Sequence, residues 1–299
     1  MIGELAALGA ALSWTVSAIL YKEALVKTKP ISANIVRLGF TSLFLLVLLV
    51  ALGRLEVLTN LSLYAVVLAG VSGIIGLGVG DTLYMASLKL IGVARAVPIT
   101  CIYPLFNILW AIFLLKETVT LPVAAGATII VLGIWLLSRE QTEKKSQNKK
   151  IMAKGVFFAL STALAWSISI AMIDMAVTLP ETGSLDHAFV INTVRVVAVA
   201  FSLLVLSPLA DRKFEFLKMK KRTAIALISG GFVALGVGWF LLAYSFLHIP
   251  QSQAVPLSST TPLYSTFAGK SLLNEKITAK IALGSLLVVI GVFMIFTLP

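Results

Sequence analysis

The sequence is poor in cysteine and histidine. Cys101 is the only cysteine among 299 residues, so the chain can form neither an intramolecular disulfide nor a cysteine-based metal centre. The two histidines, His187 and His248, fall in different predicted loops, which argues against a histidine metal pair. We therefore expect no metal site and no cofactor.

Charged residues are also scarce. They form 12% of the chain and hydrophobic residues 59%, whereas an ordinary soluble domain carries about 25% charged residues. This balance excludes a water-soluble globular protein. Apolar segments of about 20 residues, each able to cross a hydrocarbon layer roughly 30 Å thick, recur along the chain. We expect an all-α integral membrane protein with ten transmembrane helices, at residues 3–21, 31–52, 62–87, 91–114, 119–138, 154–178, 187–208, 223–246, 251–273 and 279–298.

The formal net charge is +11, from 24 basic and 13 acidic residues. Twenty of the basic residues lie in or beside the loops that join predicted helices 1 and 2, 3 and 4, 5 and 6, 7 and 8, and 9 and 10, and only Arg54 and Lys116 lie in loops on the other side. This placement indicates membrane topology and argues against nucleic-acid binding. Since cytoplasmic loops carry excess lysine and arginine, we expect a multi-pass cell-membrane protein whose basic loops face the cytoplasm and anionic lipid. Both termini are then outside.

An internal repeat divides the chain. Displaced by 158 residues, the stretch from Asn34 to Gly133 aligns without a gap with the stretch from Asn192 to Gly291. The first predicted helix repeats at an offset of 152, where Ala11-Leu-Ser-Trp14 matches Ala163-Leu-Ala-Trp166. We predict two five-helix repeats, at 1–140 and 154–299, joined by a basic linker loop at 141–153.

Five spans per repeat is an odd number, so the second repeat enters the membrane from the side opposite to the first. Inverted repeats that enclose a site near the bilayer midplane are typical of secondary transporters, because the two ends of the cavity can exchange roles. The repeat therefore favours a carrier that works by alternating access.

Several repeated motifs carry a family resemblance. A tryptophan lies midway along the first helix, Pro-x5-Pro lies on the fourth and Leu-x-Glu precedes the fifth, and the set recurs in the second half. The chain resembles the ten-helix EamA-type branch of the drug/metabolite transporter superfamily over nearly its whole length. The resemblance implies a transporter of small metabolites with a central cavity. It also implies a cytoplasmic N-terminus, whereas our expectation for the termini rests on charge.

Four charged residues fall inside predicted spans. An unpaired charge in a bilayer is costly, so we expect two ion pairs, Arg37 with Asp81 and Arg195 with Asp174, on opposite sides of the site. They would act as gates that strengthen when their own side closes, or as permanent structural pairs. A carboxyl group in a partly dry cavity also holds its proton more tightly, so Asp81 or Asp174 is a candidate proton carrier.

The candidate substrate-binding residues are aromatic or hydroxylated. Trp14 and Trp166 lie near the midplane, away from the interfacial belt where tryptophan collects, so they are predicted to face the cavity or to pack between helices. Trp239 takes the place of Asp81 in the second repeat. Ser258 and Thr261 lie one helical turn apart among four consecutive hydroxyls, some of which must bond to the backbone. The predicted binding set is Trp14, Tyr84, Tyr103, Trp166, Trp239, Ser258 and Thr261.

Prolines interrupt the fourth and ninth predicted helices. Each proline frees a carbonyl that must find a partner in protein or water, so the helices are predicted to break beside the cavity. The four prolines are Pro98, Pro104, Pro256 and Pro262.

The function expected from these features is transport of small amphipathic solutes, such as amino-acid-like metabolites, by an exporter or exchanger that is a monomer or homodimer. A passive channel or scramblase would also tolerate broken helices. An enzyme is not expected, although Gly78-Val-Gly-Asp81 matches the Gly-x-Gly-Asp signature of intramembrane aspartyl proteases. That chemistry needs a second aspartate facing the first, and Asp174 is predicted at the opposite face of the membrane.

Overall fold

The computed structural model describes residues 1–26, 28–91, 96, 99–139, 149–264 and 279–297. These residues form helices, turns and short connections, and no strand occurs among them. The predicted all-α class is confirmed. Six described helices are long and apolar enough to cross a membrane, and three shorter ones are also strongly apolar.

The first half contains the elements that the hydropathy predicts, with one extra helix in a loop. Its third span is built from three consecutive pieces. The elements are α1 (Ile2–Val26), α2 (Pro30–Ala51), the loop helix α3 (Leu55–Thr59), α4 (Leu63–Gly73), η1 (Ile74–Gly80), α5 (Asp81–Ile91), α7 (Tyr103–Phe113) and α8 (Leu121–Arg139).

The second half follows the same order. Its third span again has three pieces, and a short 3-10 helix lies in the preceding loop. The elements are α9 (Lys149–Val177), α10 (Leu185–Ala210), η2 (Glu215–Lys218), α11 (Lys221–Gly231), η3 (Phe232–Gly238), α12 (Trp239–Ser245), α13 (Gln251–Ser258) and α15 (Ala279–Thr297).

The middle piece of each third span is a π-helix, and the two π-helices, η1 and η3, lie 158 residues apart. Each ends at a glycine that touches an indole of the other half. A Cβ atom at Gly80 would lie 2.8 Å from Trp166 Cδ1, and one at Gly238 would lie 2.7 Å from Trp14 Nε1. Only glycine leaves room for such close approach. Single π turns of this kind are frequent at functional sites.

The fourth and ninth spans are interrupted, and the sequence predicted that prolines would break both of them. Turns at residues 101–102 and 259–260 precede a new helical segment in each case. Pro104 is the second residue of α7, and Pro262 follows the turn at 259–260. Proline fits the first turn of a helix because its missing N–H has no partner there.

The other two prolines do not mark breaks in the described structure. Pro256 lies inside α13, which continues to Ser258, so the prediction of a break at Pro256 is wrong. Pro256 is the sixth residue of α13, so it removes the one hydrogen bond that an N–H there would make to the carbonyl of Ser252, and α13 ends two residues later. Pro98 lies outside the described residues.

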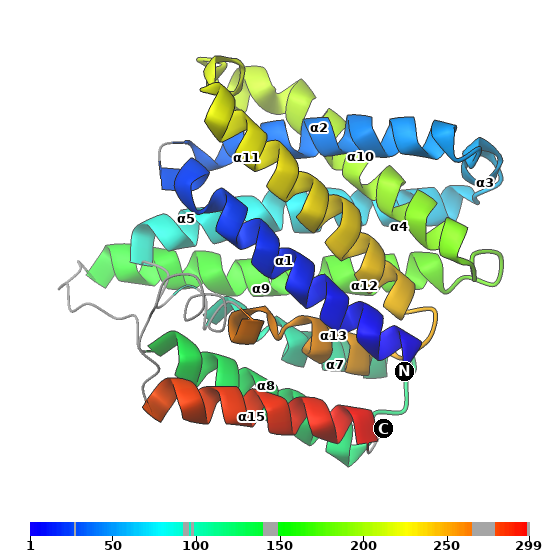
Figure 1. Cartoon of the computed structure of the whole chain (residues 1–299), viewed down its shortest axis with the longest axis vertical. Helices are drawn as coiled ribbons and strands as arrows, with labels where there is room; N and C mark the ends of the chain where they lie inside the picture. Colours follow the sequence, from blue (N-terminus) through cyan, green and yellow to red (C-terminus); the bar gives the residue numbers. More distant parts are fainter. Residues whose placement is uncertain (27, 92–95, 97–98, 140–148, 265–278, 298–299) are drawn as a thin grey trace.

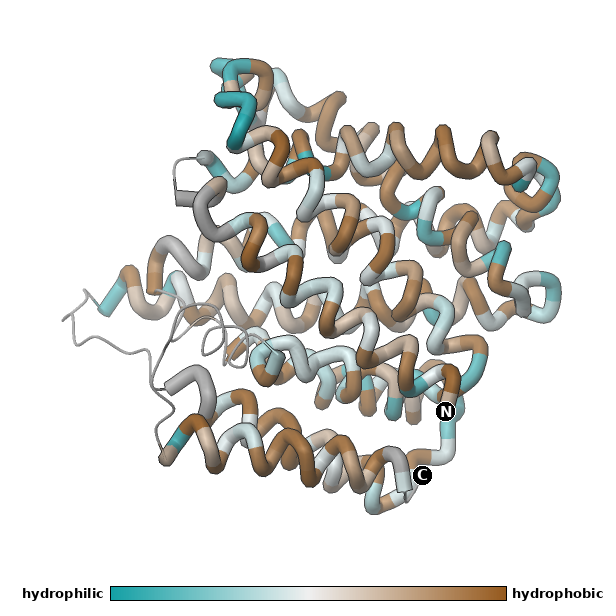
Figure 2. The backbone as a smooth tube through the Cα atoms, in the orientation of Figure 1, coloured by the Kyte–Doolittle hydropathy of each residue, from teal (hydrophilic) through white to brown (hydrophobic). Residues whose placement is uncertain are grey.

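The start of α1 and the end of α15 lie at one end of the molecule, and the loop between α10 and α11 lies at the other (Figure 1). Apolar residues dominate the helices, and hydrophilic colour gathers at the helix ends (Figure 2), as expected for a membrane protein. Large apolar side chains such as Phe44, Phe201 and Phe293 face outward. A charged side chain in the middle of that lipid-facing band would be costly.

Helices α8 and α15 lie side by side at one edge of the molecule (Figure 1). A Cβ atom on Gly126 would lie 2.9 Å from the carbonyl oxygen of Gly291, and one on Gly133 would lie 2.7 Å from that of Gly284. Gly126 and Gly284 are repeat equivalents, and so are Gly133 and Gly291. The crossed pairing shows that the two equivalent helices run antiparallel.

Candidate substrate cavity

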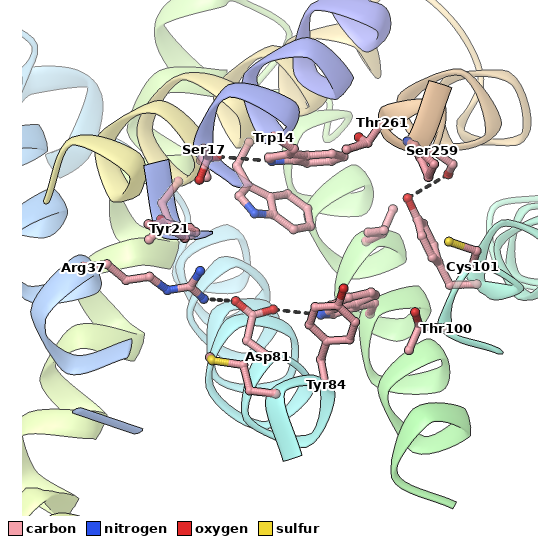
Figure 3. Close-up of a pocket in the computed structure, with 18 of the residues that line it drawn as sticks. Trp14, Ser17, Tyr21, Arg37, Asp81, Tyr84, Thr100, Cys101, Ser259 and Thr261 are labelled. Atoms are coloured by element: carbon pink, nitrogen blue, oxygen red, sulfur yellow. Dashed lines mark hydrogen bonds and ion pairs between the residues drawn. The ribbon is translucent and has the colours of Figure 1, made fainter. Parts of the chain in front are cut away.

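A cavity of about 310 Å³ lies between the two halves (Figure 3). Elements α1, α2, α5 and α7 of the first half and α9, α11, η3 and α12 of the second contribute to its lining. The cavity brings together nine residues that the sequence analysis singled out: Trp14, Arg37, Asp81, Tyr84, Tyr103, Trp166, Trp239, Thr261 and Pro262.

Aromatic rings form much of the wall. Tyr84 and Tyr103 both contact Trp166, with ring centroids 5.1 and 5.8 Å away. On the opposite wall, Trp14 and Trp239 lie 5.3 Å apart. Rings at these separations pack favourably and hold one another in place. The cavity therefore offers rigid apolar surfaces to a solute.

Among the described lining residues, one ion pair supplies fixed charge. A terminal nitrogen of Arg37 donates to Asp81 Oδ2, and the side chains are only 12% and 15% exposed. Trp166 Nε1 donates to the other carboxylate oxygen, Oδ1, over 3.0 Å. Arg37 Nε donates to Asn34 Oδ1 over 2.7 Å. The carboxylate is thus held by a helix of its own half and by an indole of the other half.

The second predicted ion pair, Arg195 with Asp174, is not made. Arg195 is fully buried, and it donates through Nε to Ser72 Oγ over 3.0 Å and through Nη2 to Ser169 Oγ over 2.9 Å. Its guanidinium also covers the ring of Trp239. The prediction fails because the two repeats share one geometry. Arg37 faces Asp81, and Arg195 faces the equivalent residue, which is Trp239.

Asp174 does not line the cavity either. It lies in the last turn of α9, is 4% exposed, and its carboxyl group makes no hydrogen bond or ion pair with any described residue. A second aspartate facing Asp81, which protease chemistry would need, is absent from the described part of the cavity wall.

The hydroxyls after Pro256 divide into two groups. Ser258 is fully buried, donates to the carbonyl oxygen of Val255 and does not line the cavity, contrary to the prediction. Its neighbour Ser259 does line the cavity and donates to Tyr103 Oη over 2.7 Å. Thr261 lines the cavity but donates to the carbonyl of Ala11. The turn at 259–260 rotates the chain, so a continuous helical register misplaces these residues.

Other lining residues were not in the predicted binding set. Ser17 and Tyr21 follow Trp14 by three and seven residues on α1. This spacing repeats on one face of a helix, so it could have identified them. The remaining residues are Ala33, Met85, Thr100, Cys101, Ile170, Leu227, Ala234 and Leu235.

The cavity lies nearer the end of the molecule that carries the basic loops. Tyr21 is near the end of α1, while Ala33 and Leu227 are near the starts of α2 and α11. At the opposite end, hydrogen bonds link the segment before α8 to the start of α13. Glu117 accepts hydrogen bonds from the backbone N–H groups of Gln251 and Ser252, over 2.7 and 3.1 Å, at the start of α13.

No group of three metal-binding side chains occurs in the described ranges. The residues that meet in the cavity can bind a solute through stacking, hydrogen bonds and one pair of opposite charges. Such a set suits recognition of a small amphipathic molecule.

Comparison with known proteins agrees with this architecture. The chain is 23% identical over 300 residues to a protein of Archaeoglobus fulgidus described as "Uncharacterized transporter", which it covers to 99%. A solved structure titled "Crystal structure of protein" superposes with a TM-score of 0.77 over 99% of each chain, at 17% identity, and so shares the fold. The sequence model of the EamA-like transporter family matches residues 1–139 and 153–297. The chain therefore belongs to the EamA-like transporter family and is a multi-pass membrane transporter.

Proposed function

We propose that this transporter is a secondary carrier in which the cavity between the two inverted repeats binds one small solute at a time. The observation that carries the proposal is the cavity itself. Its walls come from both halves, it is lined by three indoles, and it contains a charged pair. A site shared by two inverted repeats is the arrangement that alternating access requires.

The substrate class that fits best is a small zwitterionic or amphipathic metabolite, such as an amino acid or a relative of one. The aromatic walls suit an apolar side group, and Arg37 and Asp81 offer one charge of each sign. A polyphosphate would need several cations, whereas Arg37 is the one basic residue among the described lining residues.

The ion pair would act in gating. Arg37 lies on α2 and Asp81 at the start of α5, so their contact links two spans of the first half beside the cavity. A solute that competes for either charge would loosen this link and bias the equilibrium between the two states. Asp81 is also our candidate proton carrier. Transport that depends on the pH gradient would support this role.

The distribution of lysine and arginine indicates which side of the membrane the cavity faces. If the basic loops face the cytoplasm, as the distribution of lysine and arginine favours, then the structure represents a state whose cavity lies toward the cytoplasm. The termini are then outside. Cysteines introduced at residue 28 and at the exposed position 183 should react with an impermeant reagent from opposite sides of the membrane, and reaction from one side would overturn the inverted topology.

The carrier proposal is tested with purified protein. A thermal-shift screen against a metabolite library identifies candidate solutes, and uptake into proteoliposomes follows, with and without a pH gradient. We expect saturable uptake that accelerates when unlabelled solute is preloaded on the other side. Flux that does not saturate and shows no such counterflow would indicate a channel or a scramblase.

A further inference from the structure

The two repeats treat their equivalent arginines differently. In the second half, the hydroxyls of Ser72 and Ser169 accept the hydrogen bonds of Arg195. Ser169 is the repeat equivalent of Ser17, and Arg195 is the equivalent of Arg37. The first half therefore holds the same arginine and serine, but its serine is not used in this way.

Ser17 is a buried hydroxyl without a partner. Its side chain is 2% exposed, it lines the cavity, and its Oγ makes no hydrogen bond with any described residue. The hydroxyl of Tyr21, one helical turn further along α1, is likewise buried. It makes no hydrogen bond of ordinary geometry with a described residue, but it lies within electrostatic reach of Arg37. A buried polar group without a partner costs free energy, so native structures seldom keep one unless a ligand or water satisfies it.

Tyr21 takes the place of the second serine. The equivalent of Ser72 is Gly230, and a Cβ atom there would lie 2.5 Å from the Tyr21 ring. The missing side chain makes room for the tyrosine. Two serines thus bind the arginine in the second half, whereas in the first half a serine and a tyrosine line the same cavity as the arginine.

Arg37 has a terminal nitrogen, Nη1, beyond the two nitrogens that bond to Asn34 and Asp81. Its Nε and Nη2 atoms donate to Asn34 and Asp81, and the guanidinium also interacts electrostatically with Tyr21, which leaves Nη1 on the side of the two hydroxyls. Its central carbon lies 5.7 Å from the centre of the Tyr21 ring. Figure 3 shows Ser17, Tyr21 and the end of Arg37 along one side of the cavity. Two hydroxyl donors beside a guanidinium form a site for an anion.

We propose that Ser17, Tyr21 and Arg37 form the subsite that binds the carboxylate of the transported solute. The inference rests on the proposed carrier function and deepens it by assigning one charged group of the substrate to named residues. The solute's carboxylate accepts hydrogen bonds from both hydroxyls and from the guanidinium. The aromatic wall formed by Trp14 and Trp239 lies beside this subsite and receives the apolar part of the solute.

The test uses the full-length protein and three probes that share a phenyl ring: L-phenylalanine, 3-phenylpropionate, which lacks the amine, and phenethylamine, which lacks the carboxylate. Binding is measured by the thermal shift and by quenching of cavity tryptophan fluorescence. We expect the two carboxylates to bind at least about tenfold more tightly than the amine, since hydrogen bonds to charged groups contribute that much.

Substitutions then assign the effect. Ser17→Ala should weaken the binding of both carboxylates by about tenfold and leave phenethylamine unchanged, and Tyr21→Phe should act in the same direction. Ser13→Ala is the matched control, because Ser13 lies one turn earlier on α1 and donates to the carbonyl of Gly9. Carboxylate binding by Ser17→Ala and Tyr21→Phe within twofold of wild type, or stronger binding of phenethylamine, would overturn the subsite.

Failure of the subsite and failure of the carrier proposal give different results. Saturable counterflow of some other solute, with no binding of either carboxylate, leaves the carrier intact and removes the carboxylate subsite. Absence of saturable flux for every solute that shifts the melting temperature removes the carrier, and the inference falls with it.

Discussion

The guanidinium of Arg195 lies over the indole of Trp239, with 3.7 Å between its central carbon and the ring centroid. In the first half, the equivalent residues Arg37 and Asp81 form an ion pair. In each repeat, therefore, the first residue after the π-helix of the third span faces the equivalent arginine of the second span. The π face of an aromatic ring attracts a cation without adding a full charge, so an indole can replace the carboxylate at this position.

This relationship predicts that a carboxylate is acceptable at position 239. Trp239→Asp should pair with Arg195, whereas Trp239→Asn has nearly the same shape and cannot. Breaking a buried pair is costly, so we expect the Asp variant to melt at least about 3 °C above the Asn variant. Thermal unfolding in detergent measures the difference, and equal melting temperatures would show that a carboxylate at position 239 gains no stability from Arg195.

Loss of the first-half ion pair should impair both stability and transport. In Asp81→Asn, Arg37 keeps its burial but loses its counter-ion, which we expect to cost about 3 kcal/mol in unfolding free energy and at least tenfold in transport rate. The matched control is Asp186→Asn, because the Arg54–Asp186 pair is exposed, with side chains 45% and 36% accessible. Such surface pairs contribute about 0–1 kcal/mol.

The transport measurement separates a gating pair from a purely structural one. If purified Asp81→Asn transports as fast as wild type and keeps the same pH response, Asp81 plays no part in gating or proton transfer, whatever its effect on the melting temperature.

The contact between α8 and α15 depends on glycine. Gly133→Ala would place a methyl group 2.7 Å from the carbonyl oxygen of Gly284, so the two helices must separate. We expect a loss of about 1–3 kcal/mol, typical of overpacking. Gly39→Ala in α2 is the control, since a Cβ atom there meets nothing within 4 Å. Thermal unfolding distinguishes them, and equal stability of the two variants would contradict the close helix contact.

Acid should destabilise the basic-loop end through Asp211. Burial raises the pKa of this carboxyl, but hydrogen bonds from Ser32 Oγ, at 2.9 Å, and from the backbone N–H of Phe216, at 3.1 Å, outweigh it and leave the pKa below its usual value. A lowered pKa in the folded state means that the carboxylate stabilises the protein above the pKa of the unfolded chain, about 3.9. This stability is lost as the pH falls through the folded-state pKa.

Melting temperature measured between pH 3 and pH 7 tests this linkage. Asp211→Asn should flatten the acid side of the profile, because it removes the titrating group. Glu215→Gln, which removes an exposed partner of Lys29, should leave the profile nearly unchanged. An identical acid slope in wild type and Asp211→Asn would show that Asp211 contributes nothing to it.

Local patterns in the sequence were sufficient for the spans and for much of the cavity. Apolar length and repeat spacing predicted the helices, and an unusual depth in the membrane identified Trp14 and Trp166, which both line the cavity. The prolines predicted that the fourth and ninth spans break, but they did not predict the exact turns at 101–102 and 259–260. The π-helical turns were not predicted, because each ends at a glycine that packs against an indole of the other half, and that neighbour is not visible in a local pattern.

By itself, the sequence determined that the chain is a duplicated membrane protein, because hydropathy, basic loops and self-similarity are properties of the chain alone. Only the tertiary structure decided the partners of the buried charges. Arg195 meets Ser72 of the other half and Trp239, whereas the sequence pointed to Asp174. A buried arginine is stabilised by whichever groups surround it in space, and at the seam between the halves those groups come from spans that are far apart in the chain.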